Sequence, residues 1–350
     1  MLSLEQVGSY EWQFVYPEAY EELMEEFHQG VELLEGGRLK KAERIFRQTL
    51  AQMPDHLDAL HHLALVLDEQ GRKAIARTVW EEAVRIGRAA FPAGFDPGRD
   101  RLEWGWLDNR PFLRCLQGLA LAYREAGDTE RALGLYRDLL ALNPGDNQGV
   151  RGVMAEALFE LSRPAEVLAL CERYPGDIMP ELTYGRALAL FTSGRRREAD
   201  RALRETVGGS PIVAAELLKA KHRRPRSRFP GSVTVGGPDE AFDYWEHHGK
   251  FWEATPGALG WLRGIVDART PRRVAQAGVQ PSAIMREEGL SLAKTIRARF
   301  HDGKFEPLEA VDLPDGREVT LTIVEAPSTP DFAAFSRAAG PGREPSMRRG

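Results

Sequence analysis

The sequence predicts an all-α fold, a solenoid of helix–turn–helix units, with a small all-β module near its C-terminus. Three observations lead to this prediction. Small, aromatic and turn residues recur with a period of about 34 residues, as in stacked helical repeats. Glycine and proline mark the ends of the expected helices. Near the C-terminus, apolar and polar residues alternate around two Asp-Gly pairs, which is the pattern of a β-hairpin.

The chain has 350 residues, 43% of them hydrophobic, which is enough for two domains with cores of their own. Its formal net charge of −5 argues against a global basic field that would draw it onto nucleic acid or an anionic membrane. It has no run of about 18 apolar residues and no signal-like N-terminus, so we expect a cytoplasmic protein without a membrane span. Cys115 and Cys171 are expected to be ordinary thiols.

The helical repeat is clearest in the stretch that begins at Leu113. Its spaced positions are Ala120, Tyr123, Gly127, Ala132, Tyr136 and Pro144. These spacings match the tetratricopeptide (TPR) pattern, in which alanines let two helices approach and glycine ends the first helix. The same register fits residues 23–56, 57–88 and 180–211, and a degraded unit with Pro164 near its turn lies before the last of these. We therefore predict a TPR solenoid over residues 23–220, after an N-terminal segment 1–22.

An insertion at residues 89–112 interrupts the period. Its first half is rich in proline and glycine and is expected to be a loop. We expect Trp104 and Trp106 to seal the gap between the second and third units; the alternative is an exposed ligand platform. Asn109 is expected to cap the helix that Pro111 begins.

After the repeats, residues 221–265 are predicted to hold a basic linker and an aromatic helix. The linker "KHRRPRSRFPG" is expected to be solvated, with a nucleic-acid-binding arm as the alternative. The helix carries Phe242, Trp245, Phe251 and Trp252, and such a helix commonly caps the last repeat of a solenoid.

In a TPR stack, positions 2, 5, 9 and 12 of each unit line a concave groove. We expect this groove to bind a protein or peptide, and Arg114, Arg124 and Arg151 to form a basic strip for a peptide carboxylate. The alternative is that these arginines pair with nearby acids. The predicted groove residues are Asp58, His61, Arg114, Gln117, Arg124, Gln148, Arg151, Glu181 and Tyr184.

Motifs that carry chemistry are absent from the sequence. It contains no phosphate-binding glycine loop, nucleophile elbow or HExxH motif. His56, His61 and His62 lie near one repeat junction, but adjacent helical residues point about 100° apart and rarely chelate one metal. We therefore expect no enzyme activity, cofactor or metal. Asp146 or Asn147 is expected to cap the helix that follows.

The C-terminal stretch "KTIRARFHDGKFEPLEAVDLPDGREVTLTIVE" alternates like three short strands. Strands this short bury too little surface to be stable alone and leave open edges, so we expect two copies to pair. The expected dimer residues are Ile296, Ala298, Phe300, Phe305, Leu308, Val319, Leu321 and Ile323.

The helical region resembles a group of bacterial TPR proteins related to suppression of tumorigenicity 7. The resemblance spans residues 12–262 and is carried by "LEWGWLDNRPFLR", "LNPGDNQGVR", "MPELTYGRALALF" and "YWEHHGKFWEATPGALGWL". It implies a helical scaffold without an established reaction.

The C-terminal stretch is similar to antitoxin-like proteins of the AbrB/VapB swapped-hairpin class. This resemblance implies a dimer of interlaced hairpins that can bind DNA, and a tail that wraps a PIN-type ribonuclease toxin. Phe332 and Phe335 would contact the toxin, and Arg297 and Arg299 would either meet DNA phosphates or line an exposed strand face. The expected boundaries are a linker at 266–290, the antitoxin-like β-hairpin domain at 291–326 and a flexible tail at 327–350.

Together, these features predict a non-enzymatic TPR scaffold that dimerises through its C-terminal module and can bind a toxin. The alternative function is a DNA-binding antitoxin-type regulator in which the TPR region acts as a sensor.

Overall fold

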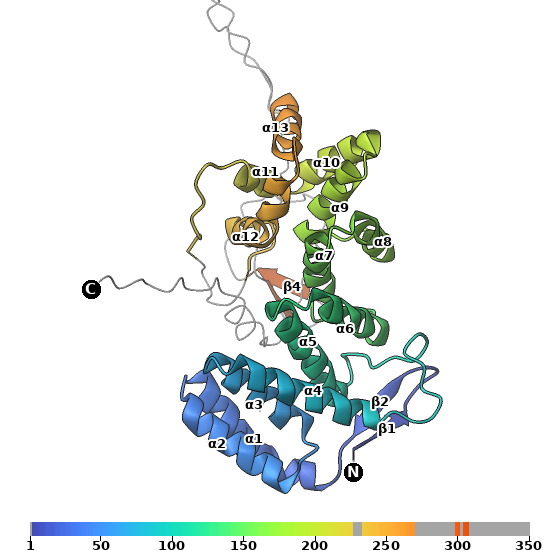
Figure 1. Ribbon diagram of the computed structural model, residues 1–350, viewed down its shortest axis with the longest axis vertical. Helices are drawn as coiled ribbons and strands as arrows, with labels where there is room; N and C mark the ends of the chain where they lie inside the picture. The colour runs from blue at the N-terminus through green and yellow to red at the C-terminus, as the bar shows by residue number, and fades with distance from the viewer. Residues whose placement is uncertain (1, 227–232, 270–297, 302–303, 308–350) are drawn as a thin grey trace, which may run out of the picture. The chain divides into compact units, whose positions relative to one another are not determined.

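The computed structural model describes residues 2–226, 233–269, 298–301 and 304–307 (Figure 1). The chain divides into two compact units, of which the second comprises Pro271–Asp331. The described part of the first unit contains thirteen α-helices and one β-hairpin. Its helices form TPR-like hairpins that stack into a solenoid, as predicted from the sequence.

The hairpins pair consecutive helices, α1 with α2, α3 with α4, α5 with α6, α7 with α8 and α9 with α10. The helix bounds are α1 Ala19–Glu35, α2 Leu39–Gln52, α3 Leu57–Glu69, α4 Lys73–Ala89, α5 Arg110–Glu125, α6 Thr129–Leu142, α7 Val150–Glu160, α8 Pro164–Arg173, α9 Pro180–Thr192, α10 Arg196–Gly209, α11 Pro211–Leu217, α12 Pro238–Ala254 and α13 Ala258–Arg269. The first helix of each unit also packs against the first helix of a neighbouring unit, as α3 does with α5.

Glycine makes the turn within the regular repeats. Gly37, Gly71, Gly127 and Gly194 all have positive φ, between +69° and +83°, directly after the first helix of their units. The degraded fourth unit has no glycine there, and Ser162 takes φ +56° instead. Pro164 then begins α8, where its missing N–H costs no hydrogen bond.

The small positions of the repeat lie where paired helices touch. Ala42, Ala76, Ala132 and Ala199 are fully buried. One turn later, the large positions fill the space between neighbouring units, and Phe46, Trp80 and Tyr136 are buried there. This packing confirms the predicted repeat.

The sequence did not predict the β-hairpin at the N-terminus. Strand β1 (Ser3–Gln6) pairs antiparallel with β2 (Trp12–Val15), with Leu4 opposite Phe14. Phe14 is fully buried and lies 5.3 Å, between ring centroids, from Phe112 of α5. The hairpin therefore shares the core of the repeats.

Asn109 joins this hairpin to the insertion. Its Oδ1 accepts a hydrogen bond from the N–H of Phe14 at 3.1 Å, and its Nδ2 donates to the carbonyls of Trp12 at 2.9 Å and Glu103 at 3.2 Å. Its side chain makes no capping bond to α5, so the predicted role as a helix cap was wrong. Asn109 is fully buried, and its side chain links the insertion to the N-terminal hairpin, with Phe14 lying 95 positions before it in the chain.

The aromatic helix does more than cap the solenoid. Helix α12 packs against α11 and α13, and also against α7 and α9, which are first helices of the fourth and fifth units. Consequently it covers one side of these two units. Figure 1 shows α12 beside α7 and α9.

The described part of the second unit is one antiparallel hairpin. Strand β3 (Ala298–His301) pairs with β4 (Lys304–Pro307), with Phe300 opposite Phe305. The predicted third strand and the tail lie outside the described residues, together with Ile296, Leu308, Val319, Leu321, Ile323, Phe332 and Phe335.

Candidate functional site

The concave face of the solenoid divides into two halves. At the ninth position of each unit, Val31, Leu65 and Leu121 of the first three units are half-buried. The equivalent residues of the last two units, Ala155 and Leu188, are almost completely buried. The first half of the face therefore presents an apolar stripe, which we define as Val31, Leu65 and Leu121.

Helix α12 covers the second half. The ring of Tyr184 on α9 lies 5.6 Å from that of Tyr244 and 6.2 Å from that of Trp252, both on α12. The hydroxyl of Tyr184 donates to the carbonyl of Ser210 at 2.6 Å and accepts from the N–H of Ala214 at 3.1 Å. Tyr184 was predicted to line the groove, but its side chain is fully buried and serves the core.

A network of charges fixes α12 to the solenoid. Arg124 of α5 bonds Glu156 at 2.6 Å and Glu160 at 2.8 Å, and Lys250 of α12 lies 3.0 Å from both carboxylates. Burial alone would raise the pKa of Glu156, but the hydrogen bond and charge of Arg124 lower it to about 2. Glu156 is thus ionised at neutral pH and holds α5, α7 and α12 together.

Arg151 also forms ion pairs with two carboxylates. It bonds Asp146 at 2.7 Å and Asp177 at 2.5 Å. Asp146 in addition accepts the N–H of Val150 at 2.6 Å, so it caps α7 as predicted. Because Arg124 and Arg151 each serve two carboxylates, the predicted strip of three arginines does not present three available charges, and the alternative of local pairing describes these two residues.

Glu181 lies at the start of α9, close to the acidic face of α12. Burial raises its pKa to about 7, and the charges of Asp243 and Glu240 act in the same direction. Its Oε2 is buried without a hydrogen-bond partner among the described residues. Glu181 therefore holds its proton more strongly than an ordinary glutamate does.

The remaining predicted groove residues form an interlocked polar layer. Gln148 donates to the side-chain oxygen of Gln117 at 2.6 Å and also bonds the carbonyl of Leu113. Asp58 accepts from Arg114 at 3.2 Å. His61 accepts the indole N–H of Trp80 at 3.2 Å. These side chains set the spacing between α3, α4, α5 and the turn before α7.

The histidines near this layer do not converge on one point. His56 Nδ1 caps α3 by accepting the N–H of Ala59 at 3.1 Å, and His62 Nδ1 bonds the carbonyl of Asp58 at 2.8 Å. Burial lowers the pKa of His56 to about 4 and that of His61 well below its usual range. His56 and His61 are therefore neutral packing residues.

Sequence reasoning missed Arg110, one helical turn before Arg114. Its guanidinium lies 5.1 Å and that of Arg114 5.7 Å from the ring centroid of Trp104. Trp104 and Trp106 were predicted to seal the gap between the second and third units. Trp104 packs against the core and lies beside two arginines of α5, whereas Trp106 is 38% exposed. The signal was present in the sequence as two arginines spaced i, i+4 directly after "WGWLDN".

Within the described ranges, one group of side chains has the spacing of metal ligands. Asp243, Glu246 and His247 lie on one face of α12, with one ligand atom from each within 4.8 Å of the others. Glu246 also pairs with Arg224, and His247 Nδ1 lies 3.7 Å from Glu156. An acidic helical face that recruits cations from its own chain explains this arrangement.

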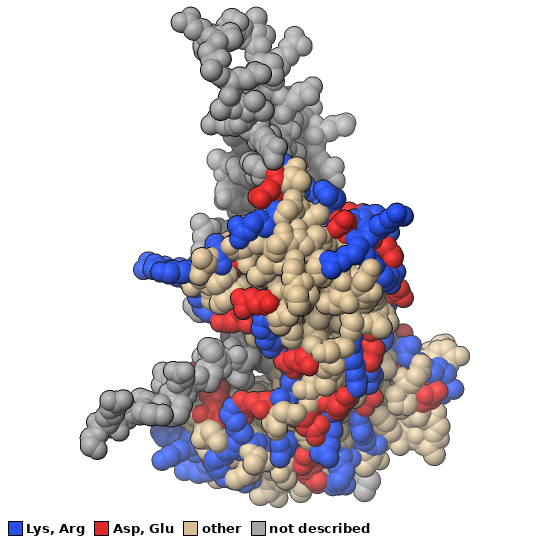
Figure 2. Space-filling view, turned by 45° about the horizontal axis from the view of Figure 1, so that its top comes forward, with Lys and Arg blue, Asp and Glu red and all other residues tan. Residues whose placement is uncertain are grey.

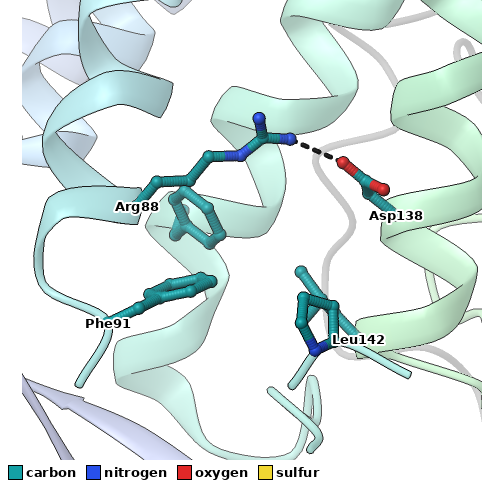
Figure 3. Close-up of a pocket in the computed structure, with 6 residues that line it drawn as sticks. Arg88, Phe91, Asp138 and Leu142 are labelled. Atoms are coloured by element: carbon teal, nitrogen blue, oxygen red, sulfur yellow. Dashed lines mark hydrogen bonds and ion pairs between the residues drawn. The ribbon is translucent and has the colours of Figure 1, made fainter. Parts of the chain in front are cut away.

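A mostly apolar cavity of about 310 Å³, shown in Figure 3, is lined by residues of α4, the insertion, α5 and α6. Phe91, Phe112 and Leu142 form its walls, and Arg88 and Asp138 point toward one another across it, 2.5 Å apart. Pro97 of the insertion completes its lining. Its lining contains no pair of a nucleophile and a base.

Lys and Arg side chains alternate with Asp and Glu over the face of the molecule in Figure 2. Much of this mixture consists of ion pairs, such as Arg137 with Glu166 at 2.5 Å. This face therefore has no field of one sign, in agreement with the small net charge. No helix among the described residues has both the length and the apolar character needed to cross a bilayer.

Comparison with known proteins places the helical region in a family. The profile of "Transcriptional repressor TCF25" matches residues 12–271, about three quarters of the chain. The chain belongs to the TCF25 family. This match covers the region whose phrases resemble the suppression-of-tumorigenicity-7 group, and the comparisons do not show a relation to that group.

The C-terminal region of this TCF25-family chain has a second match. Residues 292–337 are similar to the AF2212-like family, and this stretch contains β3 and β4. This match overlaps the segment 291–326 that the sequence predicts as a separate domain. It does not establish the resemblance to AbrB/VapB antitoxins.

Solved structures with similar folds include several TPR proteins. YrrB, "a TPR protein with an unusual peptide-binding site", is 16% identical, covers 55% of this chain and 93% of its own, and gives a TM-score of 0.39. A TPR protein from Parabacteroides merdae is 17% identical over 72% and 87%, with a TM-score of 0.41. PilF of Pseudomonas aeruginosa is 15% identical over 71% and 100%, with a TM-score of 0.39. At these levels the similarity says nothing of ligands. No curated protein matches the chain.

Proposed function

We propose that this TCF25-family protein is a cytoplasmic, non-enzymatic scaffold that binds a protein segment on the concave face of its first three units. The observation that carries the proposal is the contrast at the ninth repeat position. Val31, Leu65 and Leu121 remain half-exposed, whereas the equivalent residues of the last two units are buried. An apolar stripe left open on a concave surface suits a helix or an extended peptide.

Helix α12 supports this proposal because it acts as an internal ligand of the second half. It places aromatic rings against Tyr184 and Phe159, and it directs Lys250 to Glu156 and Glu160. The same concave surface therefore accepts a helix by aromatic packing with a charged rim. The family description suggests that the bound partner has a regulatory role.

The test uses a double variant of the stripe. Leu65→Ser with Leu121→Ser removes apolar surface that α12 does not cover, and Ile75→Ser is a matched control because Ile75 is 47% exposed on α4. Proteins that co-purify with the wild type should be lost with the double variant and kept with Ile75→Ser. The same set of proteins from all three would sink the proposal.

We also propose that the C-terminal domain dimerises the chain. Support comes from the AF2212-like match at residues 292–337 and from the hairpin of β3 and β4, whose strands have only four residues each. Hairpins of this size need further strands or a partner for stability. Sedimentation of the full-length protein at micromolar concentration should give a dimer, and a monomer there would contradict this proposal.

Binding of a PIN-type toxin through Phe332 and Phe335, and DNA binding as a regulator, are further proposals that depend on this dimer. A small nuclease should co-purify with the wild type and be lost with Phe332→Ser and Phe335→Ser. DNA binding would appear as a complex that weakens steeply with salt. Co-purification therefore tests toxin binding, and the salt titration tests DNA binding.

A further inference from the structure

Arg110 is a half-buried cation that has no acidic partner within the described part of the chain. Its Nε donates to the carbonyl oxygen of Trp104 at 3.0 Å, and its guanidinium lies over the ring of the same residue. No other hydrogen bond of this side chain occurs within that part. The two terminal nitrogens, Nη1 and Nη2, are therefore left to donate outward.

The electrostatic environment of Arg110 differs from that of other arginines. Burial and the positive charge of Arg114 both lower the pKa of Arg110. Acidic neighbours raise the pKa of five other arginines, namely Arg85, Arg99, Arg124, Arg151 and Arg195. No acidic side chain in the described part of the chain offsets the charge of Arg110. A bound anion would stabilise the charged form of this partly buried side chain.

The surroundings of Arg110 are apolar. Trp104 lies beneath its guanidinium, and Trp106 and Leu107, which precede it in the chain, are 38% and 64% exposed. Leu107 begins the short 3-10 helix that leads directly into α5. A charged donor and exposed apolar side chains thus occur within one short segment.

We propose that Arg110, Arg114 and Trp104 form a binding site for a carboxylate attached to an apolar group, as in a peptide. Arg110 is the principal binding residue, because its Nη1 and Nη2 can bond both oxygens of one carboxylate. Arg114 lies one turn further along α5, with its guanidinium 5.7 Å from the centroid of the same ring, and it is paired with Asp58 at 3.2 Å.

This site does not rest on the apolar stripe, since none of its three residues belongs to the stripe. Calorimetric titration of the full-length protein at low salt tests it with four probes. These are acetyl-Leu-Leu with a free carboxylate, its C-terminal amide, acetyl-Leu-Asp amide and inorganic phosphate. We expect the free acid to bind about tenfold more tightly than its amide, as befits a charge-assisted hydrogen bond.

Arg110→Gln should weaken binding of the acid by about tenfold, to the level of the amide. Arg85→Gln is the matched control, because Arg85 is an exposed arginine that pairs with Glu82, and it should leave binding unchanged. The acid–amide comparison uses the wild type and so remains decisive even if Arg110→Gln folds poorly. Preference for acetyl-Leu-Asp amide would assign the carboxylate to an acidic side chain instead of a chain terminus.

Equal affinity for the acid and the amide would overturn the proposal. So would phosphate binding without peptide binding, or equal losses in Arg110→Gln and Arg85→Gln. None of these outcomes bears on partner binding by the stripe, which Leu65→Ser with Leu121→Ser tests separately.

Discussion

Lys250 of α12 lies 3.0 Å from Glu156 of α7, and this contact links α12 to the first helix of the fourth repeat. Lys250 is half-exposed, so the contact is expected to be weak, at about 1 kcal/mol or less. Glu156 is buried and also holds Arg124, so its loss is expected to cost more. Two predictions of different size follow from one ion pair.

Lys250→Met should increase amide hydrogen exchange in α12 by about fivefold or less, because the methylene stem still packs while the charge is gone. Glu156→Gln should destabilise the first unit by about 1–3 kcal/mol in urea unfolding, since it removes one of the two carboxylates that pair with Arg124 and leaves Glu160 as the other. Lys41→Met, at an exposed position of α2, is the control and should change neither property. Faster exchange in α12 with Lys41→Met would show that the effect is not specific.

Stability should fall as the pH is lowered from about 6.5 to 4. His56 and His248 have ordinary pKa values of 6.5, which burial lowers to about 4 and about 3. The unfolded chain therefore binds more protons in this range, and each histidine contributes a loss of about 1.4 kcal/mol per pH unit. Glu181, with its pKa raised to about 7, acts oppositely between pH 4.5 and 7, so the steepest loss is expected below pH 4.5.

Urea unfolding followed by circular dichroism from pH 7.5 to 4 measures this loss. His248→Phe should flatten the curve, because it removes one of the histidines that take up a proton on unfolding while keeping a ring against Tyr244. An unchanged slope in His248→Phe would exclude His248 as a contributor.

Gly118→Ala should destabilise the protein by about 1–3 kcal/mol, because of steric conflict. A Cβ atom there would lie 2.6 Å from Nε1 of Trp80, the atom that donates to His61. Gly134→Ala is the matched control, since Gly134 lies within α6 with nothing near its Cβ direction. It should stabilise the protein by up to about 1 kcal/mol through helix propensity. Thermal unfolding of both variants measures the change in stability. A loss of stability in both would refute the steric explanation.

Asn109→Ala should loosen the N-terminal hairpin and cost about 3 kcal/mol, since three hydrogen bonds to buried backbone groups are lost. Limited proteolysis should then cut within residues 1–18, where the wild type resists. Asn147→Ala, at an exposed position, should leave the cleavage pattern unchanged. Resistance of Asn109→Ala to cleavage would show that the hairpin is held by its core contacts alone.

The sequence predicted the features that depend on neighbours in the chain. The glycine turns, the alanine contacts and the Asp146 cap all follow from spacings within one unit. These features are local because the first and second helices of a TPR unit meet by a fixed register.

Features that depend on distant pairs were not predictable in this way. The N-terminal hairpin is short, and Asn109, its main polar partner, lies 95 positions away. Arg124 was expected to face a ligand because its acids, Glu156 and Glu160, belong to another repeat. Arg110 was missed because the sequence does not show which arginines lack an acidic partner. In the described structure no carboxylate pairs with Arg110, and this is what makes it a candidate binding residue.

The hydrogen bonds of Asn109 also determine when the N-terminal hairpin can be completed during translation. Trp12 and Phe14 leave the ribosome about 95 residues before the side chain that binds them. At a typical rate of about 5–20 residues per second, the hairpin waits for roughly 5–20 seconds with its apolar side chains unsatisfied. The first two repeats must form in this interval without their N-terminal cover, so nascent chains that stall before residue 109 would expose Phe14 to chaperones.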